Sequence, residues 1–212
     1  MKDIPLFTTK AGVASLILKE IPYTERAYIR IQASQSPDEL LHECTDFCRA
    51  VGAEYIFATG AELSEKYPLH CKIIKMCCDR TGVPDTDAAL FPVVENTLEQ
   101  FRQIYNQKMK DVPTAAFMTL SDARNMLAKG NGYFVHRNGE LLGIGIADGD
   151  TIHGIAAVLP GAGQDVLLAL NHALSGDRIL VEVASNNQPA MRLYNQLGFI
   201  CISEIESWYK IL

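Results

Sequence analysis

The sequence predicts an α/β protein built from two units, and three features support this prediction. Strand-like and helix-like segments alternate along both halves of the chain, an order typical of α/β proteins. The stretch from Pro84 to Pro92 is rich in turn residues, so we place a domain boundary there and expect units 1–90 and 91–212. Finally, 48% of the 212 residues are hydrophobic and 21% are charged, a composition that can bury a sizeable core.

The first half is interpreted as a small unit of strands around one helix. Alternating apolar residues predict strands over 14–21, 27–33 and 53–60. Between the last two, a helix is predicted, with Ser36 as its cap, Pro37 in its first turn and Gly52 as its stop. The apolar period does not decide whether residues 69–85 begin as a strand or as a short helix.

The second half predicts two helices, then three strands, then further helix and strand segments. Apolar residues at helical spacing indicate helices over 93–111, over 119–130 (with Thr119 or Ser121 as cap) and over 161–176. Asn138–Gly139 is a strong two-residue hairpin signal, and a second turn follows at 148–150. These turns predict an antiparallel meander between the second and third helices.

The stretch NNQPAMRLYNQLGF predicts a helix that its own residues bound at both ends. Asn187 can cap the first amides, Pro189 suits the first turn, and Gly198 supplies the left-handed residue that ends a helix. Apolar residues at 190, 193, 194 and 197 form one face. A half-buried strand is predicted before it, over 178–184, and strand-like alternation resumes after Phe199.

Charge and hydropathy exclude several classes of function. The formal net charge is −6, which argues against a duplex-DNA binder because such proteins neutralise phosphates with clustered Lys and Arg. No segment approaches the roughly 20 apolar residues of a membrane span, and residues 1–12 lack the long apolar stretch of a signal peptide. We therefore expect a cytoplasmic protein that binds neither nucleic acid nor membrane.

Six cysteines are expected to be free thiols in a reducing compartment. A metal or thiol-redox protein remains an alternative, since His42 and His70 lie near five of them, but no CxxC pair with a return pair is present. No metal ligands are therefore assigned.

Residues from about 91 to 212 resemble a GNAT-type N-acetyltransferase. The residues that carry the resemblance match the family pattern Asn-x-x-Ala-x-x-x-Tyr-x-x-x-Gly-Phe, with Asn187, Ala190, Tyr194, Gly198 and Phe199 at the named positions. The resemblance implies a mixed, mainly antiparallel twisted sheet flanked by helices and ending in a hairpin. The first unit repeats a strand, helix, strand order and is interpreted as a degenerate, partial GNAT-like half that serves as a scaffold or substrate-side wall.

The resemblance also implies acetyl-CoA as co-substrate. The backbone of Ala156 to Val158 would pair with its pantetheine arm and polarise the thioester carbonyl. The amides of Gly161, Ala162, Gly163 and Gln164 would hold its diphosphate, since glycines permit close approach at a helix N-terminus. This loop departs from the family pattern: it is shorter, and no basic side chain lies in it.

By the same resemblance, Tyr194 is the general acid beside the CoA sulfur, and Asn187 meets the pantetheine or caps the helix. His153 is the first candidate for the base, because imidazole titrates near neutrality, and Glu182 is the next. For His136 and His172, no neighbouring sequence pattern supports a role as the base.

The function expected is therefore transfer of an acetyl group from acetyl-CoA to a primary amine, small or peptidic. A non-catalytic CoA-binding or ligand-binding module is the alternative that the shortened loop favours, and a homodimer is left open. A general acid and a polarised carbonyl are what such a transfer needs.

Overall fold

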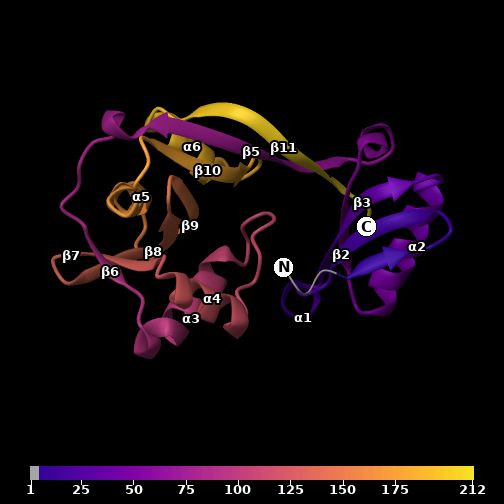
Figure 1. Ribbon diagram of the computed structural model, residues 1–212, viewed down its shortest axis with the longest axis horizontal. Coiled ribbons are helices and arrows are strands. Elements are labelled where there is room, and N and C mark those ends of the chain that lie inside the picture. Colours follow the sequence, from indigo (N-terminus) through magenta and orange to yellow (C-terminus); the bar gives the residue numbers. More distant parts are fainter. Residues whose placement is uncertain (1–4) are drawn as a thin grey trace. The chain divides into compact units, whose positions relative to one another are not determined.

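The computed structural model describes residues 5–212, which form two compact units (Figure 1). The first unit combines Met1–Ile73 with Glu204–Leu212, and the second is Ile74–Ser203. The division therefore lies at residue 73 instead of within 84–92, and the last nine residues return to the first unit. Sequence reasoning missed this because one strand, β5, carries the chain from one unit to the other without a turn. The signal-peptide prediction rests partly on residues 1–4, outside the described residues.

The first unit is a sheet with one long helix against it. Its elements are β1 (Leu6–Thr8), β2 (Gly12–Ile17), α1 (Ile21–Thr24), β3 (Arg26–Ser34), α2 (Pro37–Ala50), β4 (Tyr55–Thr59) and a 3₁₀ helix (Ala61–Glu65). Helix α2 buries Leu40, Leu41, Cys44 and Cys48 against this sheet. Gly52 ends the helical segment at φ 99°, as predicted, whereas Ser36 precedes the helix without capping it through its side chain.

The elements of the second unit follow the sequence prediction except for its first complete strand, which lies in the stretch 84–92 that was predicted to be a turn-rich boundary. They are β6 (Ala89–Pro92), α3 (Leu98–Met109), α4 (Leu120–Lys129), β7 (Gly132–Arg137), β8 (Glu140–Asp148), β9 (Thr151–Ala157), α5 (Gly163–Asn171), β10 (Arg178–Ala184) and α6 (Gln188–Gln196). Two short 3₁₀ helices, Arg80–Gly82 and Glu95–Thr97, complete it. Thr119 is the cap of α4, and its hydroxyl accepts from the amide of Asp122. Asn138 and Gly139 both have positive φ, which confirms the hairpin.

Two strands run through both units, β5 (Leu69–Asp79) and β11 (Ile200–Lys210). The segment 69–85, for which the sequence did not decide between a strand and a short helix, thus begins as strand β5. The final hairpin that the resemblance implied is absent from the described chain, because β11 continues as a single strand and β5, from earlier in the sequence, pairs in the place of a last strand. The order of segments along the chain could not show that β5 takes the place of a last strand.

The strand orders of the two units match position by position. The order is β1-β2-β3-β4-β11-β5 in the first unit and β7-β8-β9-β10-β5-β11 in the second, with β6 beside β7. In each unit one helix, α2 or α5, follows the third strand of this series. The correspondence supports the interpretation of the first unit as a partial copy of the second.

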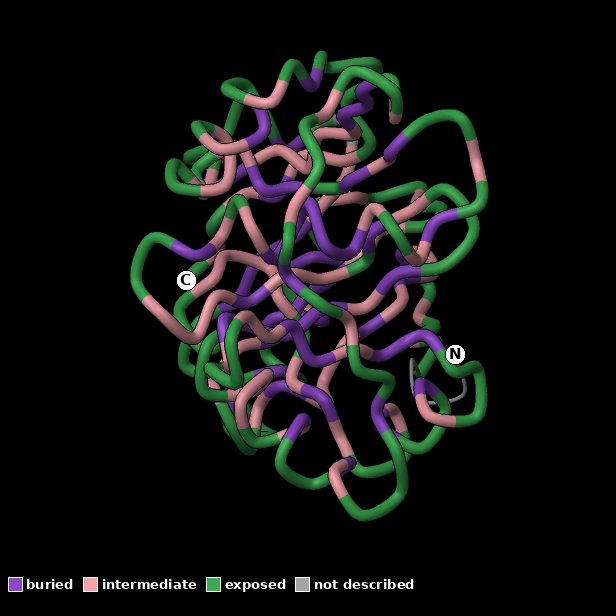
Figure 2. The backbone as a smooth tube through the Cα atoms, turned by 90° about the vertical axis from the view of Figure 1, so that its left-hand side faces the viewer, coloured by how far each residue is buried: buried purple, intermediate pink, exposed green. Residues whose placement is uncertain are grey.

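Helices cover both faces of the second unit's sheet. Helix α5 lies on one side of β7 and β8, and α3 and α4 lie on the other (Figure 1). Val166, Leu167 and Leu170 of α5 are buried in one core cluster, and Phe101 of α3 is buried in the opposite one. Figure 2 shows the same pattern along the chain, with buried segments in the elements and exposed residues gathered in loops.

Candidate active site

Strands β9 and β10 are parallel neighbours that pair only near their beginnings. The paired positions are Thr151 with Leu180 and Ile152 with Val181. Over residues 5–212, no further pairing joins these strands, although β9 continues to Ala157 and β10 to Ala184. The strands therefore separate, and the facing edges of their last residues carry no ladder of hydrogen bonds to each other.

The corresponding strands of the first unit do not separate. β3 and β4 stay paired over five positions, from Arg26 with Tyr55 to Arg30 with Thr59. Helix α2 also begins at Ser36–Pro37, without a glycine loop at its N-terminus. Within the described residues, the second unit is therefore the one in which the third and fourth strands separate beside a glycine loop.

His153 is the extra residue of a β-bulge at the start of this separation. Ile152 pairs with Ala147 of β8, and Gly154 pairs with Ile146, so no residue of β8 lies opposite His153. Bulges re-aim side chains and are common beside active sites. Because Ile152 is also the last residue of β9 that pairs with β10, the predicted base lies where the two strands part.

The His153 side chain is half exposed and bonded to a carboxylate. Its Nε2 lies 3.0 Å from Oδ1 of Asp148, and Oδ2 of Asp148 accepts a hydrogen bond from Nδ2 of Asn131. These hydrogen bonds, first from His153 and then from Asn131, lower the pKa of Asp148. The carboxylate is therefore ionised near neutral pH.

The other predicted base, Glu182, lies at the same level on β10. It follows Val181, the last paired residue of that strand. Val181 and Val183 are buried in the cluster around α5, so the alternation of a strand places Glu182 on the opposite face, where it is exposed. The structure thus places both candidate bases next to the last paired position.

The loop after β9 presents free backbone amides. The amides of Val158 and Leu159 both donate to the Leu142 oxygen, at 2.8 and 3.2 Å, and Ala162 donates to Leu159. Within the described residues, no acceptor meets the amides of Gly161, Gly163 and Gln164. The Ala162 amide closes the turn in this structure, while the other three amides stay available to an anion, and the binding of a diphosphate by this loop stays a prediction.

One arginine lies between two carboxylates beside this loop. Asp165 stands in the first turn of α5, and Arg137 at the end of β7 lies 2.6 Å from it and 2.6 Å from Asp87. These contacts explain why the pKa of Arg137 is raised. Because Arg137 is shared by two carboxylates, it offsets only part of the unfavourable effect of Asp165 on a bound anion, and the three side chains together keep a net negative charge.

Two side chains of α3 that sequence reasoning did not single out lie along β9. Lys108 donates from Nζ to the Val158 oxygen over 3.2 Å. One turn earlier, Tyr105 covers Gly154, where an added Cβ would lie 3.6 Å from its ring. Tyr105 and Lys108 lie three residues apart on a predicted helix, so the sequence indicated that they share one face. It could not indicate whether that face contacts a strand or solvent.

Tyr194 lies on α6 with its ring buried. The residue is 8% exposed, its ring centroid is 5.3 Å from that of Phe199, and its burial raises its pKa to about 12. Its hydroxyl has no hydrogen-bond partner among residues 5–212. A Cβ at Gly163 would lie 3.5 Å from Leu193, so the residue next to Tyr194 packs at the N-terminus of α5.

The ends of α6 follow the sequence prediction. Asn187 caps the helix, since its Oδ1 accepts a hydrogen bond from the Ala190 amide. Of the two predicted roles, helix cap and pantetheine contact, this oxygen therefore has the first. Gly198 has φ 81°, and the Phe199 amide returns to the Tyr194 oxygen at 3.0 Å. These contacts hold Tyr194 at one place relative to the helix stop.

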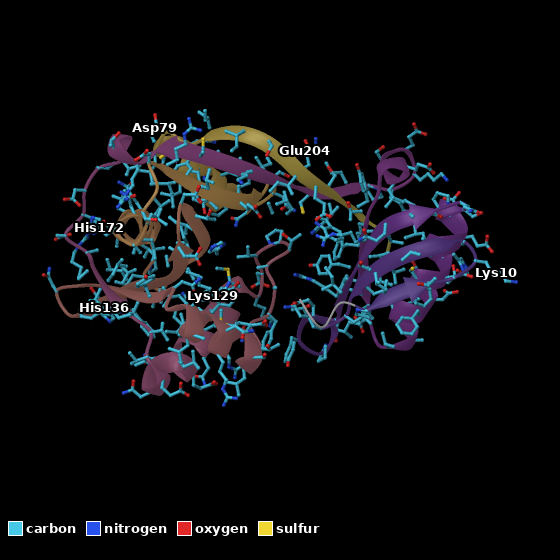
Figure 3. The ribbon with its side chains drawn as sticks, viewed as in Figure 1. Lys10, Asp79, Lys129, His136, His172 and Glu204 are labelled. Atoms are coloured by element: carbon cyan, nitrogen blue, oxygen red, sulfur yellow. The ribbon has the colours of Figure 1, made fainter. Side chains whose placement is uncertain are left out.

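The remaining histidines lie outside this constellation. His172, labelled in Figure 3, pairs with Asp85 at 3.0 Å near the end of α5, and His136 on β7 packs against Phe91. In the part of the chain that the structure describes, no group of three or more His, Cys, Asp or Glu side chains could hold a metal ion. None of the described helices is long and apolar enough to cross a membrane.

Comparisons with known proteins agree with this geometry at the level of fold. No family model and no curated protein matches the sequence. Among solved structures, a GCN5-related N-acetyltransferase from Sphaerobacter thermophilus is 11% identical with a TM-score of 0.58, covering 95% of this chain and 77% of its own. Another from Anabaena variabilis is 10% identical with a TM-score of 0.61, covering 93% of this chain and 59% of its own. A functionally unknown protein from Staphylococcus epidermidis is 10% identical with a TM-score of 0.58, covering 99% and 94%.

The chain therefore has the fold of the GCN5-related N-acetyltransferases. The mixed sheet with flanking helices, predicted from the resemblance, is confirmed. Two of these neighbours span nearly the whole chain and most of their own length, so the likeness includes both units.

Proposed function

We propose that the protein is an N-acetyltransferase that moves the acetyl group of acetyl-CoA directly to a primary amine. The observation that carries this proposal is the separation of β9 and β10 beside a loop with free amides. The separation exposes backbone groups of Ala156 to Val158 to a ligand, and the amides of Gly161, Gly163 and Gln164 suit a diphosphate. The identity of the amine is not part of the proposal.

The residues around the separation have the roles that direct transfer requires. Acetyl-CoA supplies an activated acetyl group, and the backbone near Ala156 polarises its carbonyl. As the amine nitrogen bonds to the acetyl carbon and the carbon–sulfur bond breaks, the Tyr194 hydroxyl gives its proton to the leaving sulfur. His153 takes the proton that the amine loses, with Glu182 as the second candidate. His153 then releases its proton to solvent and Tyr194 regains one from solvent, so the protein returns to its starting state.

Lys108 must move for this complex to form. Its ammonium group covers the Val158 oxygen, which the proposal assigns to the pantetheine arm. The lysine is exposed and its stem is flexible, so displacement costs one solvent-exposed, charge-assisted hydrogen bond, which water can replace.

The proposal is tested by titrating acetyl-CoA in a calorimeter and by screening amines and peptides for release of CoA thiol. We expect binding, weaker than a full-length phosphate loop would give, and thiol release with at least one primary amine. Binding without release across the screen would favour the non-catalytic module, and no binding at millimolar acetyl-CoA would contradict both functions.

The proposed role of His153 gives a second prediction. His153→Ala should lower kcat about a hundredfold, the usual contribution of a positioned base, while affinity for acetyl-CoA stays the same. His172→Ala is the matched control, because His172 is equally exposed and lies at the same 3.0 Å from a carboxylate. Equal kcat values for the two variants would transfer the role to Glu182 or to water.

A further inference from the structure

The Asp148 carboxylate lies between a buried amide and the proposed base. Asn131, at the start of β7, is 5% exposed, and its backbone oxygen accepts from the Ala147 amide at 2.9 Å. Its Nδ2 donates to Oδ2 of Asp148, whose Oδ1 lies 3.0 Å from Nε2 of His153. The chain of contacts therefore runs from a buried residue to an exposed bulge.

The donors and acceptors in this chain are determined by chemistry. An ionised carboxylate has no proton to donate, so the hydrogen between Asp148 and His153 must reside on Nε2. The neutral ring then carries its lone pair on Nδ1. The Asn131 amide must also present its NH₂ group to the carboxylate, which agrees with its orientation in the structure.

We propose that Asp148, held by Asn131, is the positioning residue of this site, and that it makes Nδ1 of His153 the atom that accepts the proton of the substrate amine. The proposal rests on the N-acetyltransferase function proposed above. A carboxylate bonded to one ring nitrogen of a histidine commonly orients the ring and selects its tautomer in this way.

The location of the three residues favours this role over a surface ion pair. His153 occupies the bulge at the last paired position of β9 and β10, so fixing its ring fixes a group at the proposed reaction centre. His172 and Asp85 form a pair of the same length at the other end of α5, where no side-chain amide bonds to Asp85. Hydrogen bonding to a buried amide is therefore specific to the pair at the bulge.

Other charged groups near the pair are few. Lys129, in the last turn of α4, acts on Asp148 in the same direction as His153, lowering the pKa of the carboxylate. Glu182 lies at the same level as His153 on β10. Asp150, in the following turn, accepts a hydrogen bond from Thr151.

The test is a double-mutant cycle with His153→Ala and Asp148→Asn, using the amine found in the thiol-release screen. Asparagine keeps the hairpin chemistry of position 148 but removes the negative charge. We expect Asp148→Asn to lower kcat about tenfold with little change in KM, because the base loses the partner that orients its ring while the contacts to substrate remain. The double variant should be no slower than His153→Ala, since a positioning residue acts only through the group that it orients.

Two further variants complete the experiment. Asn131→Ala should lower kcat by a smaller factor, also with little change in KM, and its melting curve verifies that it folds. Asp85→Asn should change neither kcat nor KM. An unchanged kcat in Asp148→Asn, or losses that multiply in the double variant, would overturn the positioning role while leaving the proposed function intact. An inactive wild type would overturn both.

Discussion

Replacing Tyr194 by phenylalanine is expected to lower kcat about a hundredfold while leaving affinity for acetyl-CoA nearly unchanged. The ring is buried and packs on Phe199, so the substitution retains the contacts that position α6. Only the hydroxyl is lost, and with it the proton for the leaving thiolate. Because the pKa of Tyr194 is raised to about 12, this proton stays on the oxygen throughout the pH range of an ordinary assay.

The melting temperature of Tyr194→Phe distinguishes loss of the proton donor from a packing defect. The Tyr194 hydroxyl has no partner among the described residues, so its removal should leave the melting temperature unchanged or slightly higher. Tyr133→Phe is the control, because Tyr133 loses a hydrogen bond to the Gly130 oxygen but lies outside the proposed site. If wild type and Tyr194→Phe turn over at the same rate, Tyr194 is a core residue and another group supplies the proton.

Substituting alanine for Gly143 is expected to destabilise the protein by about 1–3 kcal/mol and to weaken acetyl-CoA binding. A Cβ at this position would lie 2.5 Å from the Ala156 oxygen and 2.6 Å from a methyl group of Val166. The first neighbour is backbone and the second lies in the first turns of α5, so neither can move alone. Relief of the clash displaces β9 and α5, the two elements that border the proposed cofactor site.

Calorimetric melting and acetyl-CoA titration measure the two parts of this prediction. Gly82→Ala is the matched control, because no atom lies within 4 Å of its added Cβ and its backbone is not left-handed. That variant should stay within about 0.5 kcal/mol of the wild type. A Gly143→Ala protein as stable as the control would show that β9 and α5 adjust freely.

Local chemistry made much of the fold predictable from sequence. Helix α6 was predicted within two residues because Asn187, Pro189 and Gly198 mark its ends, and the Asn138–Gly139 hairpin followed from its turn residues. The glycine loop, and Asn187 with Tyr194, could be named as site candidates for the same reason. Each belongs to a pattern that lies within one short, continuous stretch of the chain. The candidate bases were also named, but only as isolated residues of two strands.

The tertiary structure decided what depends on pairing between distant segments. β5 occupies the place of a last strand in the second unit, although it comes before all the other strands of that unit in the sequence, and no local pattern records which strands are neighbours. The bulge at His153, its link through Asp148 to Asn131, and the approach of Lys108 to Val158 likewise depend on register and helix placement. Capping, turn chemistry and apolar period act over a few residues, so the sequence by itself determined the elements and the resemblance. Strand separation and side-chain contacts arise only when those elements pack, because each requires groups that lie far apart along the chain.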